Sequence, residues 1–139
     1  MLAEKFAADI AFIGAPSANV LVKKLQKLVT VPTFNLTSCG LDLHLLKYAV
    51  DRAELLISTD SGPRHYGVAL NTPTVCLMGP TAPAYTESGF PHDYVARVDV
   101  DCGPCQKKIC TKDHRCMTQL TPKTVYKVCE KALSRDYRE

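Results

Sequence analysis

The sequence lacks any apolar run long enough to cross a bilayer, and its first residues lack a signal-peptide pattern. These absences argue against a membrane-spanning protein and a secreted precursor, and they predict a cytoplasmic protein. The sequence also lacks a large excess of one charge sign, since the formal net charge is only +3. A charge this small does not by itself indicate a nucleic-acid partner. Internal repeats and low-complexity segments are absent as well.

The length and composition are those of one globular domain. The chain has 139 residues, of which 46% are hydrophobic and 22% are charged. This is enough for a real core but too little for two full α/β domains. We therefore expect residues 1–139 to form a single domain. The seven cysteines stand in a chain without a secretion pattern, so they indicate metal ligands or free thiols rather than a disulfide framework.

Short apolar runs alternate with segments of helical periodicity. Strands are predicted at residues 10–13, 33–36, 55–57, 73–78 and 94–98, and helices at about 17–28, 41–50, 63–70 and 122–134. In the first helix Val20, Leu21, Lys24, Leu25 and Leu28 recur at helical spacing, and Lys23, Gln26 and Lys27 lie on the other face. Such alternation is typical of βαβ units, which wind into a parallel sheet covered by helices. We expect a doubly wound α/β fold.

One stretch, residues 55–81, predicts an anion site. An apolar strand is followed at once by Asp60, Ser61 and Gly62, which offer a side-chain cap and a flexible turn, and by Pro63 at the first position of a helix. The N–H groups at the start of such a helix point at the carboxyl edge of the sheet, where diphosphates commonly bind.

A second turn, Gly79-Pro80-Thr81, ends the next strand on the same edge. Two turns that converge on one edge favour a pocket, with Arg64 and His65 beside it in the first helical turn. The alternative is that these residues cap the helix and do nothing more, as in most turns of this composition.

The segments named so far resemble the signature of glycosyltransferase family 9, the ADP-heptose:lipopolysaccharide heptosyltransferases. The likeness comprises Asp60-Ser61-Gly62-Pro63-Arg64-His65, Gly67-Val68-Ala69-Leu70, Pro73-Thr74-Val75 and Gly79-Pro80-Thr81, and then Cys102-Gly103-Pro104-Cys105, Cys110 and Cys116-Met117. It covers the chain from about Ile10 onward and is densest between Leu55 and Met117.

The resemblance implies a GT-B enzyme, in which two Rossmann-like halves close around a nucleotide sugar. Residues 1–139 are similar to most of the C-terminal, donor-binding half, with a cysteine-rich loop at 102–116 and a terminal helix at about 122–134. The family's N-terminal half, which holds the acceptor and supplies the catalytic base, has no counterpart here. Neither has the first strand of the C-terminal half, with its glycine-rich turn and lysine. We therefore expect no catalytic residue in this chain and little or no activity from it alone.

The resemblance also implies roles for the turn residues. The family transfers heptose from ADP-heptose to a sugar hydroxyl of the lipopolysaccharide inner core, with inversion and without a cofactor in the chemistry. The N–H groups of Ser61 and Gly62 would then bind the diphosphate as its charge grows. Asp60 would accept hydrogen bonds from the backbone or from a hydroxyl of the donor sugar.

The remaining roles follow from position along the turn and the helix. His65 would either contact the diphosphate or pack as a structural helix residue, and Arg64 would be solvated. Thr81 would donate to the nucleotide, while Pro63, Gly79 and Pro80 would shape the two turns. Gly67 inside a helix costs about 1 kcal/mol relative to alanine, which indicates close helix packing or close approach of a ligand.

The cysteine-rich loop offers a second candidate site. Cys102 and Cys105 have the spacing of a zinc knuckle, and Cys110 and Cys116 follow, so four thiolates could hold a structural zinc ion. His114 could replace one of them. The alternatives are buried free thiols, or an iron–sulfur or redox role. The other cysteines, Cys39, Cys76 and Cys129, are expected to behave as small core residues.

The same loop is basic, through Lys107, Lys108, Lys112 and Arg115. A solvated face is the default interpretation, and the alternative is a peripheral contact with anionic lipid or phosphorylated inner core at the inner face of the inner membrane. Nucleic acid is not expected, because residues 102–116 contain no aromatic side chain for stacking. A different function class also stays open: a non-catalytic α/β module whose zinc-binding loop mediates partner binding.

Overall fold

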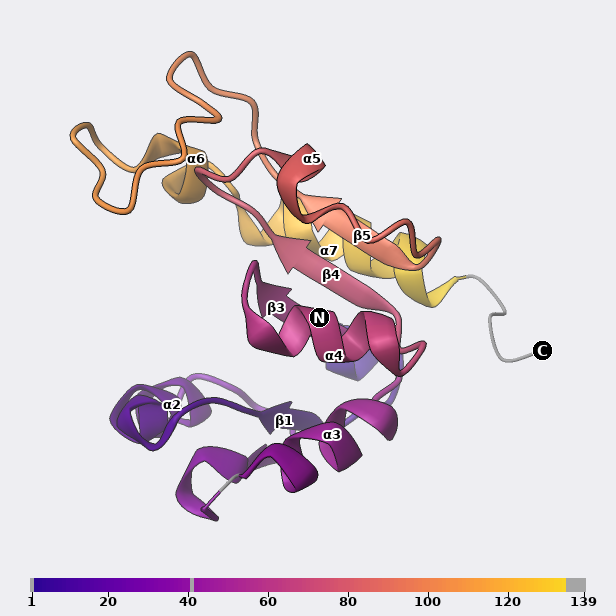
Figure 1. The fold of residues 1–139 in the computed structure, drawn as a ribbon. Coiled ribbons are helices and arrows are strands. Elements are labelled where there is room, and N and C mark those ends of the chain that lie inside the picture. The colour runs from indigo at the N-terminus through magenta and orange to yellow at the C-terminus, as the bar shows by residue number, and fades with distance from the viewer. Residues whose placement is uncertain (1, 41, 135–139) are drawn as a thin grey trace. The chain divides into compact units, whose positions relative to one another are not determined.

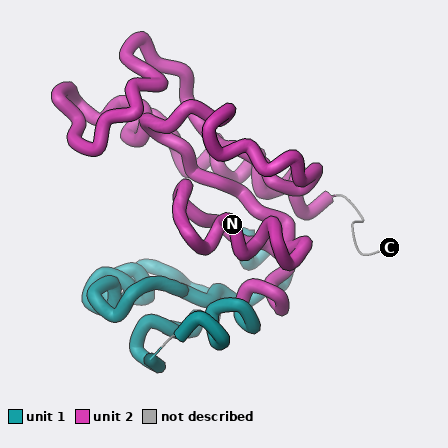
Figure 2. Tube along the Cα trace, viewed as in Figure 1, with its two compact units in different colours: residues 1–49 teal, residues 50–139 magenta. Residues whose placement is uncertain are grey.

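The computed structural model describes residues 2–40 and 42–134, and its helices and strands alternate as the sequence predicts (Figure 1). The chain divides into two compact units, unit 1 (residues 1–49) and unit 2 (residues 50–139) (Figure 2). That residues 1–139 act as one nucleotide-sugar-binding domain stays a prediction. Leu41, placed by the sequence at the start of a helix, lies outside the described residues.

Unit 1 contains a βαβ segment. Its elements are α1 (Leu2–Lys5), β1 (Ile10–Phe12), the 3-10 helix η1 (Pro16–Ala18), α2 (Asn19–Gln26), β2 (Thr33–Asn35), the 3-10 helix η2 (Leu36–Ser38) and most of α3 (Leu43–Asp51). β1 and β2 pair in parallel, with Ile10 opposite Thr33. The two strands and the two longer helices are confirmed, whereas α1 and the 3-10 helices are additional to the prediction.

The side chains predicted to share one face of α2 are largely exposed. Val20, Leu21 and Leu28 are 67%, 58% and 79% exposed, while Val22 is buried. Periodicity identifies the side chains that share a helix face, but burial requires a neighbouring element that covers that face. Exposed Cys39 is a correction, because we expected it in the core.

Unit 2 holds a second parallel sheet. Its elements are β3 (Leu56–Thr59), α4 (Gly62–Ala69), β4 (Thr74–Leu77), α5 (Pro83–Thr86), β5 (Asp93–Ala96), α6 (Arg115–Thr118) and α7 (Pro122–Leu133). The strand order is β3-β4-β5, and both pairings are parallel. Figure 1 shows α4 in front of this sheet and α7 behind β4 and β5. A doubly wound α/β arrangement is therefore confirmed.

The core of unit 2 surrounds the central strand β4. Thr74, Val75 and Cys76 have no exposed surface, as expected for a parallel strand that is covered on both faces. Cys129 of α7 is also fully buried. The predicted cap of α7 is confirmed, because the hydroxyl of Thr121 accepts a hydrogen bond from the N–H of Thr124 at 3.2 Å.

Close packing explains the glycine at position 67. A Cβ atom on Gly67 would collide with Oγ1 of Thr74 and would lie 3.0 Å from Cδ2 of Leu56. Helix α4 can therefore approach β3 and β4 only because position 67 has no side chain. In the described ranges no helix is both long and apolar enough to cross a membrane.

Candidate functional site

Two turns meet at the carboxyl edge of the sheet in unit 2. Thr59, at the end of β3, lies opposite Leu77, at the end of β4, in a parallel pair. The segment after Thr59 leads directly into α4, and the segment after Leu77 leads to α5. The prediction of two turns on one sheet edge is thus confirmed.

The start of α4 is open to solvent. Ser61 is its N-cap residue in extended conformation, and Ser61 and Gly62 are both exposed. A Cβ atom on Gly62 would meet no other atom within 4 Å. The predicted side-chain cap is wrong for Ser61, because its hydroxyl lies 3.1 Å from the hydroxyl of Thr59 and makes no capping bond to the helix. The first N–H groups therefore sit on an exposed turn without a Ser61 side-chain cap.

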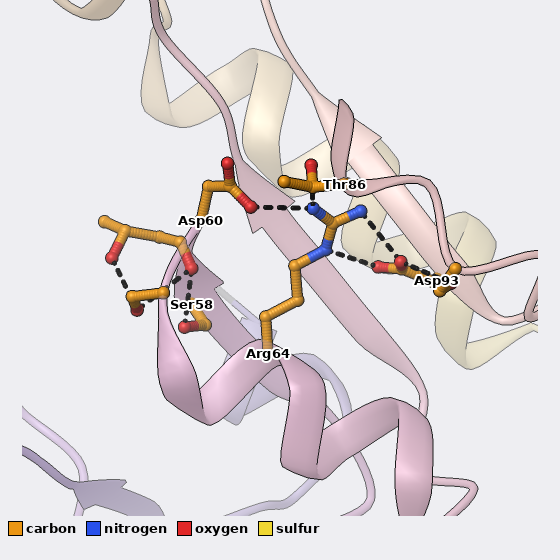
Figure 3. A network of polar contacts seen from close by, with 8 residues as sticks. Ser58, Asp60, Arg64, Thr86 and Asp93 are labelled. Carbon is orange, nitrogen blue, oxygen red and sulfur yellow. Dashed lines mark hydrogen bonds and ion pairs between the residues drawn. The ribbon is translucent and has the colours of Figure 1, made fainter. Parts of the chain in front are cut away.

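Arg64 lies at the centre of a buried polar network (Figure 3). Its Nη1 donates to Oδ1 of Asp60 and to the hydroxyl of Thr86, both at 2.8 Å. Its Nε and Nη2 donate to the two carboxylate oxygens of Asp93 at 3.2 and 2.8 Å. Ser88 donates a further hydrogen bond to Asp93 at 2.8 Å. One guanidinium therefore joins α4 to the turn after β3, to α5 and to the start of β5.

The burial of Arg64 corrects the expectation that this side chain is solvated. The side chain is 2% exposed, compared with 3% for Asp93 and 15% for Asp60. Burial by itself would lower the pKa of Arg64, but the hydrogen bonds with Asp93 and Asp60 outweigh it and raise the pKa. Arg64 is therefore a permanent buried cation.

The other predicted residues of this site are placed as follows. His65 is exposed, and it directly follows Arg64 in the first turns of α4. Pro63, Gly79, Pro80 and Thr81 are half-buried. The structure thus brings the residues of each turn to one sheet edge, while their assignment to a diphosphate or a sugar stays a prediction.

The cysteine-rich loop packs against the second turn. A Cβ atom on Gly79 would lie 2.6 Å from Sδ of Met117 and 3.5 Å from Sγ of Cys116. The N–H of Gln106 donates to the carbonyl oxygen of Pro80 at 2.9 Å. The loop is therefore attached to the turn after β4 at two points.

The four cysteines predicted as zinc ligands do not form a metal-binding cluster here. Cys102, Cys110 and Cys116 are half-buried free thiols, and Cys105 is exposed. Among residues 2–40 and 42–134, no group of three or more His, Cys, Asp or Glu side chains is close enough to hold a metal ion. The zinc site stays a prediction, which metal analysis of the purified chain would test. Buried Cys76 and Cys129 are confirmed as core residues.

Thr86 and Asp93 were not predicted from the sequence as site residues, and Arg64 was expected to be solvated. A local signal existed for one contact, since Asp60 and Arg64 are four residues apart at the start of a helix and such pairs face each other. Asp93 and Thr86 lie 29 and 22 residues from Arg64 in the chain. Only the position of α5 in the crossover and the pairing of β5 with β4 bring them to Arg64.

The family model described as glycosyltransferase family 9 (heptosyltransferase) matches residues 2–115. Lipooligosaccharide heptosyltransferase 2 from Campylobacter jejuni serotype O:2 is 28% identical over 123 residues, which are 86% of this chain and 34% of that protein. The serotype O:6 protein of the same name is 30% identical over 119 residues, which are 81% of this chain and 33% of that protein. The chain spans about a third of the length of these relatives.

Solved structures give the same fold. The structure of E. coli ADP-heptose lps heptosyltransferase II matches 95% of this chain and 39% of its own, with a TM-score of 0.76 and 20% identity. The glycosyl transferase family 9 protein from Veillonella parvula matches 93% of this chain and 38% of its own, with a TM-score of 0.72 and 25% identity. These matches confirm the predicted Rossmann-like, GT-B type of fold.

Proposed function

Because the chain belongs to glycosyltransferase family 9, we propose that it is the donor-binding part of a cytoplasmic heptosyltransferase. This enzyme transfers heptose from ADP-heptose to the inner core of lipopolysaccharide. Relatives named as lipooligosaccharide or lipopolysaccharide heptosyltransferases support the reaction class. The proposal assigns the acceptor site and the catalytic base to the part of those relatives that lies outside the matched third.

The observation that carries the proposal is the open start of α4 at the carboxyl edge of a parallel sheet. Ser61 and Gly62 are exposed there, and space is free beside Gly62. Backbone N–H groups at a helix N-terminus favour an anion, because they carry partial positive charge and need no reorientation to bind it. The diphosphate of ADP is the anion that we assign to this turn.

This placement suits the chemistry of the transfer. When the glycosidic bond breaks, the bonding electrons go to the oxygen of the ADP leaving group, whose negative charge increases. Donors that are already aligned with the diphosphate stabilise that charge more in the transition state than in the ground state. The N–H groups of Ser61 and Gly62 supply such donors in the proposal.

The side chains around the turn would complete the donor site. Asp60 has one carboxylate oxygen, Oδ1, bound to Arg64, and we assign the other to a hydroxyl of the donor sugar. The exposed position of His65 next to the turn suits a contact with the diphosphate. Thr81, from the second turn, would donate to the nucleotide.

A ligand titration followed by NMR tests the proposal. The ¹⁵N-labelled chain is titrated with ADP and with ADP-heptose to millimolar concentration, and adenosine serves as the control without phosphate. We expect the amide signals of Ser61, Gly62 and His65 to shift with both diphosphates and much less with adenosine. Shifts that are absent from these amides, or that are equal for adenosine, would overturn the proposed donor site.

A further inference from the structure

The network around Arg64 contains more negative than positive groups. One guanidinium pairs with two carboxylates, those of Asp60 and Asp93. Asp93 is almost fully buried and takes two of the hydrogen bonds, from Nε and Nη2. The third nitrogen, Nη1, is divided between Asp60 and Thr86. Arg64 therefore binds the buried carboxylate of Asp93 and the partly exposed carboxylate of Asp60 at the same time.

Asp60 keeps one carboxylate oxygen free for another partner. Its Oδ1 accepts from Arg64 at 2.8 Å, whereas Oδ2 accepts no hydrogen bond from any described residue. Figure 3 shows Oδ2 turned away from the guanidinium. The single contact with Arg64 thus fixes the side chain and leaves an acceptor at the turn after β3.

A carboxylate at this position would oppose the binding of an anion if nothing compensated its charge. Asp60 directly precedes Ser61, whose N–H the donor site needs, and like charges a few ångström apart repel one another strongly outside bulk water. Arg64, which is shared between Asp60 and Asp93, compensates part of that charge, and its raised pKa keeps the guanidinium protonated.

We propose that Arg64 is a positioning residue of the donor site, which offsets part of the negative charge of Asp60 so that a nucleoside diphosphate can bind at the start of α4, and which holds Oδ2 of Asp60 toward a ligand hydroxyl. The inference rests on the proposed function, because it requires a diphosphate at this turn. It goes beyond that function by assigning a role to a buried side chain that does not touch the ligand.

The test removes Arg64 without leaving Asp93 as an unpaired buried charge. In the double variant Arg64→Met, Asp93→Asn the net charge is unchanged and Ser88 can still donate to position 93. The neutral hydroxyl of Thr86 loses the hydrogen bond that it accepts from Arg64, and Asp60 is the one carboxylate that loses its cation. A triple variant adds Asp60→Asn, which removes the uncompensated charge. Arg52→Met is the matched control, because Arg52 is exposed and lies before β3, at the opposite edge of the sheet.

The readout is the change in the amide chemical shifts of Ser61 and Gly62 per unit of ADP concentration at the start of the titration, measured at low and at high salt. We expect a slope about tenfold smaller in the double variant at low salt, from repulsion by a free carboxylate, and a smaller difference at high salt, where that repulsion is screened. The triple variant should regain most of the slope, and Arg52→Met should match the wild type. Far-UV circular dichroism confirms that each variant is folded.

Two results would overturn the inference in distinguishable ways. If the wild-type chain responds to ADP and the folded double variant responds equally, the donor site stands and Arg64 has no positioning role. If the double variant is weaker but neither salt nor Asp60→Asn changes the difference, Arg64 acts only through the fold. If the wild type itself gives no response, the proposed function fails and this inference fails with it.

Discussion

Gly67 of α4 lies so close to Thr74 of β4 that the hydroxyl of Thr74 occupies the space of a side chain at position 67. Alanine in a helix is intrinsically favoured over glycine by about 1 kcal/mol, so helix propensity alone predicts a gain for Gly67→Ala. The collision predicts the opposite sign, a net loss of about 1–3 kcal/mol of unfolding free energy from overpacking. Urea unfolding followed by circular dichroism measures this difference.

Gly62→Ala is the control for that substitution. Gly62 lies in the same helix, and a Cβ atom there meets nothing within 4 Å. We expect its unfolding free energy to stay within about 0.5 kcal/mol of the wild type, as for most exposed substitutions. If both alanine variants are equally stable, the close approach of α4 to β4 is not real.

Gly62→Pro tests the N–H group that we assign to the diphosphate. Proline is well tolerated in the first turn of a helix, and the extended conformation of Ser61 suits a residue that precedes proline. We expect the Gly62→Pro chain to be as stable as Gly62→Ala but to show a smaller ADP-induced shift at Ser61 and His65. An undiminished response would remove Gly62 from the anion site.

The buried ion pair predicts a large stability effect. Arg64→Met leaves Asp93, 3% exposed, as an uncompensated buried charge. Breaking such a pair by removing one partner costs about 3–5 kcal/mol. We expect Arg64→Met to lose stability in this range and Asp93→Asn in the same chain to restore part of it. Chemical unfolding of the two single variants and the double variant measures the coupling, and strictly additive effects would contradict the network.

The two buried thiols predict a loss of stability at alkaline pH. Burial raises the pKa of Cys76 and of Cys129 from 9.0 to about 11. The pKa of each thiol is higher in the folded than in the unfolded chain. Its contribution to the free energy of unfolding is therefore complete below pH 9 and is lost as the pH rises through 11. It amounts to roughly 1.4 kcal/mol for each unit of pKa difference.

Unfolding in urea at pH 8, 9.5 and 11 measures this dependence. The double variant Cys76→Ala, Cys129→Ala should show a flatter profile than the wild type over the same window, because tyrosine and lysine titration is common to both chains. Identical slopes would show that the thiols are not buried as described. At pH 8 a thiol reagent should modify exposed Cys39 and Cys105 well before Cys76 and Cys129.

The alternation of strands and helices was predictable because local rules determine it. Apolar runs bounded by turn residues gave β1 to β5, and the Thr121-Pro122 pair gave the start of α7. The turns at one sheet edge followed from the parallel order of β3 and β4. The family resemblance added the assignment of those turns to a nucleotide sugar, which stays a prediction, while membership of the family is shown by the family match.

Features that depend on distant partners were not predictable. Arg64 was expected in solvent because it lies one step around the helix from His65. Thr86 of the crossover between β4 and β5, and Asp93 at the start of β5, bind it instead. The apolar residues of α2 were expected to share one helix face, and the structure leaves Val20 and Leu21 of that face exposed. In both cases the sequence gives the character of a helix face, and only tertiary structure decides what lies against it.

The central claim is that a diphosphate binds at the start of α4, and a crystal structure of the chain grown with ADP tests it most directly. The account predicts phosphate oxygens within about 3 Å of the N–H groups of Ser61 and Gly62, as in ordinary N–H to oxygen hydrogen bonds. A diphosphate bound instead to the basic loop at Lys107, Lys108 and Lys112, or a turn that stays empty at saturating ADP, would contradict it.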